Sequence, residues 1–335
     1  MPRTAILFTG QGAQSVGMGK DIAAVSSEAA AVFEQANEIV GYDLKTLCFE
    51  GPAEKLEQTD IQQPAIFTTS VAIWRALSGQ AQTGASQPDT PAAPADASGS
   101  GASGAEVWLG ETPVAMAGLS LGEYTALFAA GAVSFEDALR LVKRRGELMQ
   151  AASLAVPSGM VTALGLEAEQ IEAICREASS AGIISPANFN CPGQIVLSGE
   201  KAACEAAIKL IEAAGGRAVP LKVAGAFHSA LMKPAADGLW EMLNSTTFAS
   251  PRVPVVANVN CQYHADPVKI RRWLADQLTS PVLWQASIER LLAEGVERFV
   301  EIGPGRVLTG LLKKIARGVP VINVSSAEGL KQFAV

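Results

Sequence analysis

Residues 118–122 read Gly118-Leu119-Ser120-Leu121-Gly122, a Gly-x-Ser-x-Gly pattern whose two flanks decide how the chain folds around it. The preceding run 113–117, Pro-Val-Ala-Met-Ala, is typical of a short buried strand, and the run 123–130 favours a helix. A strand, a tight turn and a helix form the context in which a nucleophilic serine is exposed. The two glycines allow the turn, because they place no side chain beside the serine. Ser120 is therefore a candidate nucleophile; the alternative is an ordinary serine in a glycine-rich turn.

Strand-like and helix-like segments alternate outward from this turn along most of the chain. Such alternation implies a parallel sheet with helices on both faces, and with the serine turn it indicates a large α/β-hydrolase-like domain. The expected strands besides 113–117 are Ala5–Phe8, Val253–Val259, Arg298–Ile302 and Val319–Val324, and the expected helices include Glu28–Val40, Gln63–Leu77 and Ser134–Ala152.

Residues 158–223 have a rhythm of their own, in the order βαββαβ. This order is the ferredoxin-like arrangement. We therefore expect a small subdomain at 158–223, inserted into a large domain that comprises residues 1–157 and 224–335. The stretch 79–105 contains no Leu, Ile, Val, Phe or Trp. Because it has almost nothing apolar to bury, we expect a flexible surface insertion there.

Composition excludes several classes of protein. The 335 residues are 49% hydrophobic and 18% charged, which is enough for a sizeable core and excludes global disorder. The net charge of −7 argues against a nucleic-acid partner. The five cysteines are scattered without a C-x-x-C pair, so we expect reduced thiols rather than disulfides or a metal site. No apolar run approaches a membrane span. Together these features predict a soluble cytoplasmic protein.

Two further segments leave their role open. The loop Thr9–Gln14 follows the first expected strand, and its two glycines let backbone N–H groups approach a ligand. A dinucleotide-type phosphate loop is the alternative there, although the third glycine of that pattern is missing.

The run Lys143-Arg144-Arg145 lies on an expected helix, where a basic run is usually a solvated face. One of these side chains could instead point into a pocket, and spacing alone does not decide.

The sequence contains two histidines, His228 and His264. His264 lies in a polar segment, 261–267, and we expect it to be exposed to solvent. His228 follows small and aromatic residues at an expected strand–helix junction. If Ser120 has a histidine base, His228 is the better candidate, since a serine hydroxyl needs such a base to become a nucleophile. The alternative is a histidine that is satisfied within the core.

Several ordered motifs resemble those of malonyl-CoA:acyl carrier protein transacylases and of the related acyltransferase domains of fatty acid and polyketide synthases. The resemblance runs nearly end to end but leaves out the stretch 79–105. The chain departs from it at Leu119, where the family usually has histidine. The matching segments are Phe8–Gln14, Ser120–Tyr124, Arg145-Gly146, Asn188–Gln194, His228–Met232, Gln277–Trp284 and Glu301–Gly305.

This resemblance implies a role for each residue of a catalytic centre. Ser120 is similar to the acyl-accepting nucleophile and His228 to its base. The backbone N–H groups of Gln11 and Leu121 are similar to the pair that forms the oxyanion hole. Gln277 is similar to the residue whose carbonyl orients the histidine, so that a dyad replaces a full triad.

The resemblance also implies a substrate. Arg145 is similar to the residue that pairs with the malonyl carboxylate, and Phe227 places a ring where it crowds an α-methyl branch. The expected reaction is ping-pong: malonyl-CoA acylates Ser120, and the phosphopantetheine thiol of acyl carrier protein then accepts the malonyl group. No cofactor, metal, nucleic acid or membrane is expected to take part, and we expect a monomer. The alternatives are a serine thioesterase or esterase with the same Ser120–His228 pair, and an inactive scaffold subunit.

Overall fold

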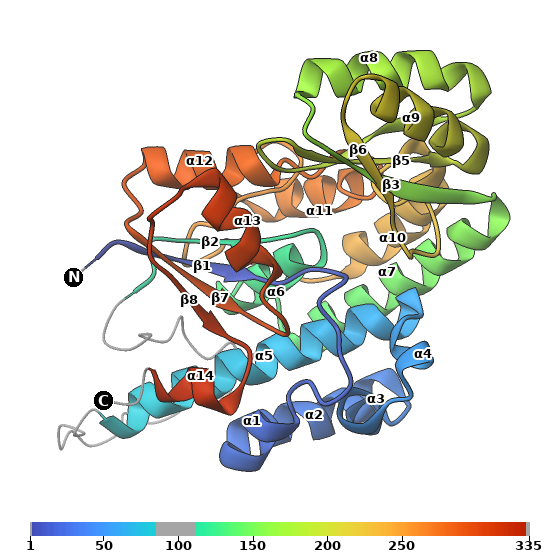
Figure 1. Cartoon of the computed structure of the whole chain (residues 1–335). Helices are drawn as coiled ribbons and strands as arrows, with labels where there is room; N and C mark the ends of the chain where they lie inside the picture. The colour runs from blue at the N-terminus through green and yellow to red at the C-terminus, as the bar shows by residue number, and fades with distance from the viewer. Residues whose placement is uncertain (1, 85–111, 333–335) are drawn as a thin grey trace.

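The computed structural model describes residues 2–84 and 112–332, and the strands of this part of the chain form two separate sheets (Figure 1). The first is a parallel sheet with strand order β2-β1-β7-β8, which confirms the predicted parallel arrangement. Its strands are β1 (Thr4–Phe8), β2 (Ala115–Gly118), β7 (Arg298–Ile302) and β8 (Val321–Val324).

Both faces of the parallel sheet are covered, as the continuous apolar runs of its strands require. Successive side chains of a strand point to opposite faces. On β1, Ile6 and Phe8 accordingly pack into one apolar cluster with the helices that follow β1 and β2, whereas Ala5 and Leu7 pack into a second cluster. The second cluster contains residues of α12 (Trp284–Ala293) and α13 (Val307–Ile315).

The long helices of the first cluster lie on the opposite side of the sheet from α12 and α13 (Figure 1). Ser134 caps the N-terminus of the expected helix that begins there, since its Oγ accepts from the Asp137 N–H at 3.0 Å. The remaining helices around this sheet are α1 (Lys20–Val25), α2 (Ser27–Val40), α3 (Leu44–Glu50), α4 (Ala53–Leu56), α5 (Thr59–Gly84), α6 (Leu121–Ala129), α7 (Phe135–Ala155), η2 (Ala230–Met232), α10 (Lys233–Ser245), α11 (Pro267–Asp276) and α14 (Ala327–Lys331).

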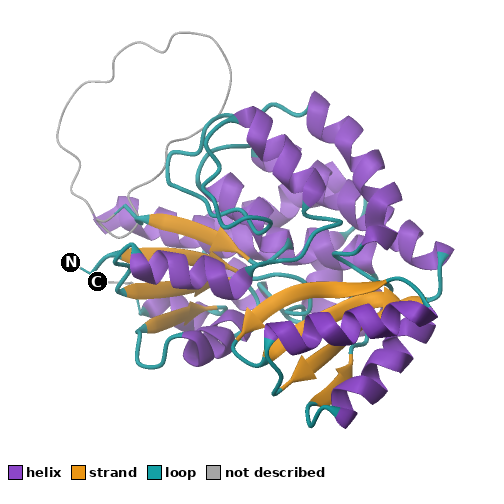
Figure 2. Ribbon diagram, turned by 90° about the horizontal axis from the view of Figure 1, so that it is seen from above, coloured by secondary structure: helices purple, strands orange, loops and turns teal. Residues whose placement is uncertain are grey.

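The second sheet is antiparallel, with strand order β4-β5-β3-β6, and Figure 2 shows it as a separate group of strands. Two helices pack on it around an apolar cluster of its own, and β4 joins it to the rest of the chain through hydrogen bonds of Ala187 and Phe189 with Val282. Its elements follow the predicted order: β3 (Ser158–Leu164), α8 (Ala168–Ala178), η1 (Ser179–Ala181), β4 (Ile184–Cys191), β5 (Gln194–Glu200), α9 (Lys201–Ala213) and β6 (Arg217–Pro220).

Two expectations need correction. The strand predicted at Val253–Val259 is absent; instead, isolated bridges join Val255 to Met116 and Val256 to Tyr263. Pro254 has no N–H to continue a ladder and contributes only its carbonyl, to the Met116 N–H. The helix predicted to end at Leu77 continues to Gly84, into the segment predicted to be a flexible insertion. The rest of that segment lies outside the described residues.

None of the described helices combines the length and apolar composition needed to cross a membrane.

Glu301, at the buried end of β7, holds the start of α13. Its carboxylate accepts hydrogen bonds from the Leu308 and Thr309 N–H groups at 2.8 and 3.0 Å, from the Thr309 hydroxyl, and from Asn323 Nδ2 at 3.1 Å. A carboxylate at a helix N-terminus satisfies N–H groups that have no partner within the helix.

We therefore expect Glu301→Gln to lower the free energy of unfolding by about 1–3 kcal/mol, because the new amide NH2 faces a buried donor. Thermal unfolding followed by circular dichroism measures the loss, with the exposed Glu328→Gln as control. An unchanged melting temperature in Glu301→Gln would contradict this role.

Candidate active site

The predicted strand–turn–helix around Ser120 is confirmed: β2 ends at Gly118 and α6 begins at Leu121. Ser120 has a φ of 51°, a value that few residues other than glycine adopt. A Cβ atom on Gly118 would lie 1.9 Å from the carbonyl carbon of Gly122, and one on Gly122 would lie 2.2 Å from the Phe8 carbonyl oxygen. Both positions therefore require glycine, and the turn exists only because nothing fills these spaces.

The structure brings Ser120, His228 and Gln277 together, as expected. Ser120 Oγ lies 2.8 Å from His228 Nε2, and both side chains are buried. His228 Nδ1 lies 2.7 Å from the Gln277 carbonyl oxygen. Because a carbonyl only accepts, the proton of the neutral imidazole is on Nδ1, which leaves Nε2 free to accept the serine proton. The geometry is that of a serine nucleophile with an oriented histidine base.

His228 is held in its neutral form. Burial, assisted by the positive charge of Arg145, lowers the pKa of His228 from 6.5 to about 4, while the hydrogen bond to the Gln277 carbonyl opposes the change. A neutral imidazole is the form that can take a proton from Ser120. The histidine is therefore ready to act as a base at neutral pH.

Of the three consecutive basic residues 143–145 on α7, Arg145 is the one buried in the site. Its Nη2 donates to Ser120 Oγ and to Gln277 Oε1, each at 3.0 Å, and its Nη1 donates to Gln63 Oε1 at 2.6 Å. Lys143 and Arg144 instead pair with Glu147 at the surface. Within the described residues, Arg145 contacts no carboxylate, and its Nε is buried without a partner. Arg145 is thus a charged donor placed beside Ser120 Oγ.

The two N–H groups predicted to form an oxyanion hole are available to a ligand. In the part of the chain that the structure describes, neither the Gln11 nor the Leu121 backbone N–H donates a hydrogen bond. Leu121 is the first residue of α6, where a backbone N–H has no partner within the helix. Gln11 lines the same cavity as Ser120.

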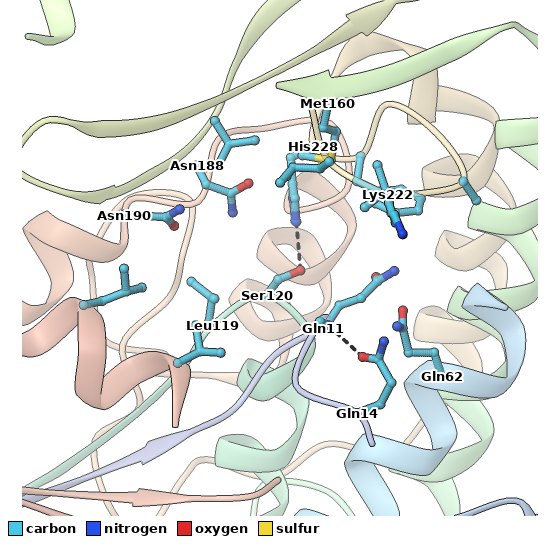
Figure 3. A pocket seen from close by; sticks show the side chains of 18 of the residues that line it. Gln11, Gln14, Gln62, Leu119, Ser120, Met160, Asn188, Asn190, Lys222 and His228 are labelled. Atoms are coloured by element: carbon cyan, nitrogen blue, oxygen red, sulfur yellow. Dashed lines mark hydrogen bonds between the residues drawn. The ribbon is translucent and has the colours of Figure 1, made fainter. Parts of the chain in front are cut away.

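A cavity of about 450 Å³ opens in front of Ser120 and His228. Amide side chains surround the pair in Figure 3, with Gln62 on one side and Asn188 on the other. The ring of Phe227 also lines the cavity, next to the histidine. The antiparallel sheet contributes Met160 and Asn188 to its lining, and the segments that follow β1 and β2 contribute Gln11 and Ser120.

Leu119 occupies the position before Ser120, where the family that the sequence resembles usually has histidine. Its half-buried side chain lines the cavity and packs against the apolar cluster beneath α12 and α13. The side chain of Asn258 holds the turn. Asn258 Oδ1 accepts from the Ser120 N–H at 2.7 Å, and Asn258 Nδ2 donates to the Gly118 carbonyl at 2.8 Å. Sequence reasoning missed Asn258, because no local pattern marks a residue that lies so far along the chain from the turn.

The prediction that His264 is exposed is wrong. Its side chain is fully buried and its Nε2 lies 2.7 Å from Glu123 Oε1, while its ring packs against Trp273. Burial of Glu123 explains the difference, since a carboxylate inside the protein needs donors around it. The available signal was Glu123 itself, the one charged residue of α6, a helix that is buried along its whole length.

Comparison with known proteins places this geometry in a family. The acyl transferase domain matches residues 103–330. The chain is 43% identical to the malonyl CoA-acyl carrier protein transacylase of Salmonella typhimurium over 316 residues, which cover 94% of this chain and 93% of that protein. It is 40% identical to the Bacillus subtilis protein of the same name over 333 residues, covering 99% and 96%.

Solved structures agree with the sequence comparison. The acyl carrier protein S-malonyltransferase of Vibrio cholerae superimposes with a TM-score of 0.87 at 42% identity, covering 98% of this chain and 99% of that one. A malonyl-transacylase in complex with a type II PKS acyl-carrier protein superimposes with a TM-score of 0.86 at 40% identity, covering 99% of both chains. Identity at this level over nearly the whole length shows that the chain belongs to the acyl transferase family, among the malonyl CoA-acyl carrier protein transacylases.

Proposed function

We propose that this protein transfers the malonyl group of malonyl-CoA to the phosphopantetheine thiol of acyl carrier protein, through a malonyl ester on Ser120. The observation that carries the proposal is the buried set of Ser120, His228, the Gln277 carbonyl and Arg145, joined by hydrogen bonds of 2.7 to 3.0 Å. Membership of the family supports the substrate and the acceptor.

In the first half-reaction, His228 Nε2 takes the proton of Ser120 Oγ as the oxygen attacks the thioester carbon. The carbonyl oxygen becomes an oxyanion, to which the N–H groups of Gln11 and Leu121 donate. Each such donor typically contributes about 3–4 kcal/mol to a transition state of this kind. The C–S bond then breaks, and the histidine returns its proton to the departing CoA sulfur. In the second half-reaction the carrier thiol attacks the ester by the same path, and Ser120 regains its proton.

Arg145 binds the free carboxylate of the malonyl group in this proposal. Its guanidinium already lies 3.0 Å from Ser120 Oγ, so an acyl group on that oxygen is within its reach. A guanidinium matches a carboxylate in geometry as well as charge. Phe227, beside His228, limits the space next to the α-carbon and so disfavours a methyl branch.

A thioesterase with the same Ser120–His228 pair is the alternative, and two observations disfavour it. The relatives are transacylases. The second is Arg145, whose guanidinium lies 3.0 Å from Ser120 Oγ and suits an acyl group that carries a free carboxylate.

The finer architecture belongs to the same proposal. We assign residues 158–223 to a ferredoxin-like subdomain, and their separate apolar cluster supports this assignment. We assign residues 1–157 and 224–335 to an α/β-hydrolase-like domain.

We further propose that the protein acts as a monomer in the cytoplasm, with five reduced cysteines. Sedimentation equilibrium tests the monomer, and a stable dimer would exclude it.

Ser120→Ala should abolish formation of the malonyl-enzyme while leaving the fold intact, because the lost hydroxyl contributes little to the core. Intact-mass measurement after mixing with malonyl-CoA detects the adduct. The matched control is Ser153→Ala. The hydroxyl of Ser153 is buried and donates to the Met149 carbonyl, outside the site, so this variant should still be malonylated. A malonyl adduct on the Ser120→Ala protein would overturn the assignment.

The rate of acylation should stay constant as pH falls through 6.5 and decline with a midpoint near the lowered pKa of about 4. The neutral imidazole is the active form, so activity is lost only where His228 becomes protonated, and kcat/KM reports the free enzyme. Arg145→Met should move the midpoint upward, since the arginine charge is one cause of the lowered pKa. A wild-type midpoint near 6.5, measured by stopped-flow acylation, would contradict a buried neutral histidine.

Arg145→Met should reduce malonyl transfer by about thirtyfold or more, because a buried carboxylate without its partner costs about 2–5 kcal/mol. Acetyl transfer should not fall by the same factor, since acetyl has no carboxylate. Competition between malonyl-CoA and acetyl-CoA measures the ratio, and the exposed neighbour Arg144→Met is the control. If the Arg145→Met protein keeps its preference, the carboxylate is bound elsewhere.

A further inference from the structure

Glu123 is a buried carboxylate that the proposed reaction does not use. It is the third residue of α6, on the turn that carries Ser120, and it is 1% exposed. Its Oε1 lies 2.7 Å from His264 Nε2, and its Oε2 accepts from the Asn258 N–H at 3.0 Å and from Gln277 Nε2 at 2.7 Å. An ionised carboxylate only accepts hydrogen bonds, so it suits a site that offers three donors.

Two of these three partners hold the catalytic atoms directly. The Asn258 side chain bonds the backbone of Gly118 and Ser120 on either side of the turn. Gln277 accepts the His228 Nδ1 proton with its carbonyl and donates Nε2 to the Ser120 carbonyl at 3.1 Å. Glu123 therefore lies behind the nucleophile and is bonded to both of the residues that orient the nucleophile and its base.

The Gln277 side chain also lies between two buried groups of opposite charge. Its Oε1 accepts from Arg145 Nη2 and its Nε2 donates to Glu123 Oε2. The reversed orientation of the amide would turn its NH2 toward the guanidinium and its oxygen toward the carboxylate. Charge at both ends thus fixes the direction of the side chain, and such charge-assisted hydrogen bonds are the stronger ones.

We propose that Glu123 is a positioning residue for acyl transfer: through Gln277 and Asn258 it holds the His228–Gln277 hydrogen bond, the Arg145 guanidinium and the Ser120 backbone in one arrangement. It touches neither the substrate nor the reacting atoms. The inference rests on the proposed function, and it concerns how the site is held rather than which acyl group is transferred.

The two histidines provide a readout that needs no substrate. His228 carries its proton on Nδ1, which faces a carbonyl, whereas His264 carries a proton on Nε2, which faces Glu123. With only two histidines in the chain, NMR of 15N-histidine-labelled protein should show these opposite assignments. Glu123→Gln keeps the shape of the side chain but turns an NH2 group toward His264 Nε2. We expect the His264 proton to move to Nδ1 and the His228 Nδ1–H resonance to shift.

The kinetic measurement uses the same variant. In Glu123→Gln, single-turnover malonylation of Ser120 should fall by about 10- to 100-fold, as small displacements of catalytic groups typically cost, while KM for malonyl-CoA changes less than about twofold. Glu301→Gln is the matched control, since Glu301 is equally buried and bonded by donors but lies outside the cavity lining. It should lose thermal stability yet keep the wild-type rate per folded molecule and the wild-type His228 signals.

A second variant tests whether Glu123 acts through Gln277. Gln277→Met removes the side-chain amide and keeps the backbone carbonyl, so it should lower the rate to a similar extent, and adding Glu123→Gln should cost little more. A wild-type rate in either single variant, or independent losses that multiply in the double variant, overturns the proposal. So do unchanged His228 signals in Glu123→Gln. A wild-type enzyme that forms no malonyl adduct would contradict the proposed function instead.

Discussion

The backbone of Ser120 is the constraint on which the site depends. A positive φ at a residue other than glycine costs about 1–3 kcal/mol and persists only where the surroundings enforce it. Here Gly118 and Gly122 leave room for the turn, and Asn258 bonds the backbone on both sides of the serine. His228 has a φ of 58° as well. Both partners of the central hydrogen bond are thus held in uncommon conformations by contacts from other segments.

Burial sets the protonation state of His228. Removed from water, His228 stays neutral and able to accept a proton, and the charge of Arg145 reinforces that state. The same burial makes an unbalanced charge costly, which is why the network around Arg145 extends to a second buried charge, Glu123. Gln277 joins the two: its backbone carbonyl bonds His228 Nδ1 and its side chain bonds both charged groups. One residue therefore couples the electrostatics of the site to its geometry.

The two sheets position different parts of the site. The parallel sheet, covered on both faces, supplies the turn that carries Ser120 and the loop that contains Gln11. The antiparallel sheet contributes Met160 and Asn188 to the opposite wall of the cavity (Figure 3). His228 lies on the segment that leads from β6 back to α10. The cavity thus forms where the chain passes from one sheet to the other, and its walls are set by how the sheets pack.

The sequence by itself determined the elements and the chemistry of the turn. Short apolar runs identified the strands of the parallel sheet and one further strand, Val253–Val259, that the structure lacks. The order within 158–223 matched the elements found there, and the two glycines marked the turn. Each of these signals depends on residues only a few positions apart. Tertiary structure decided the rest. Spacing along the chain did not separate Arg145 from Lys143 and Arg144, although the family resemblance did, and the fold buried Arg145. Folding alone placed His264 against a carboxylate 141 positions away and brought Asn258 to the turn. Such pairings depend on which groups lose water together, and burial is a property of the packed chain rather than of any local stretch.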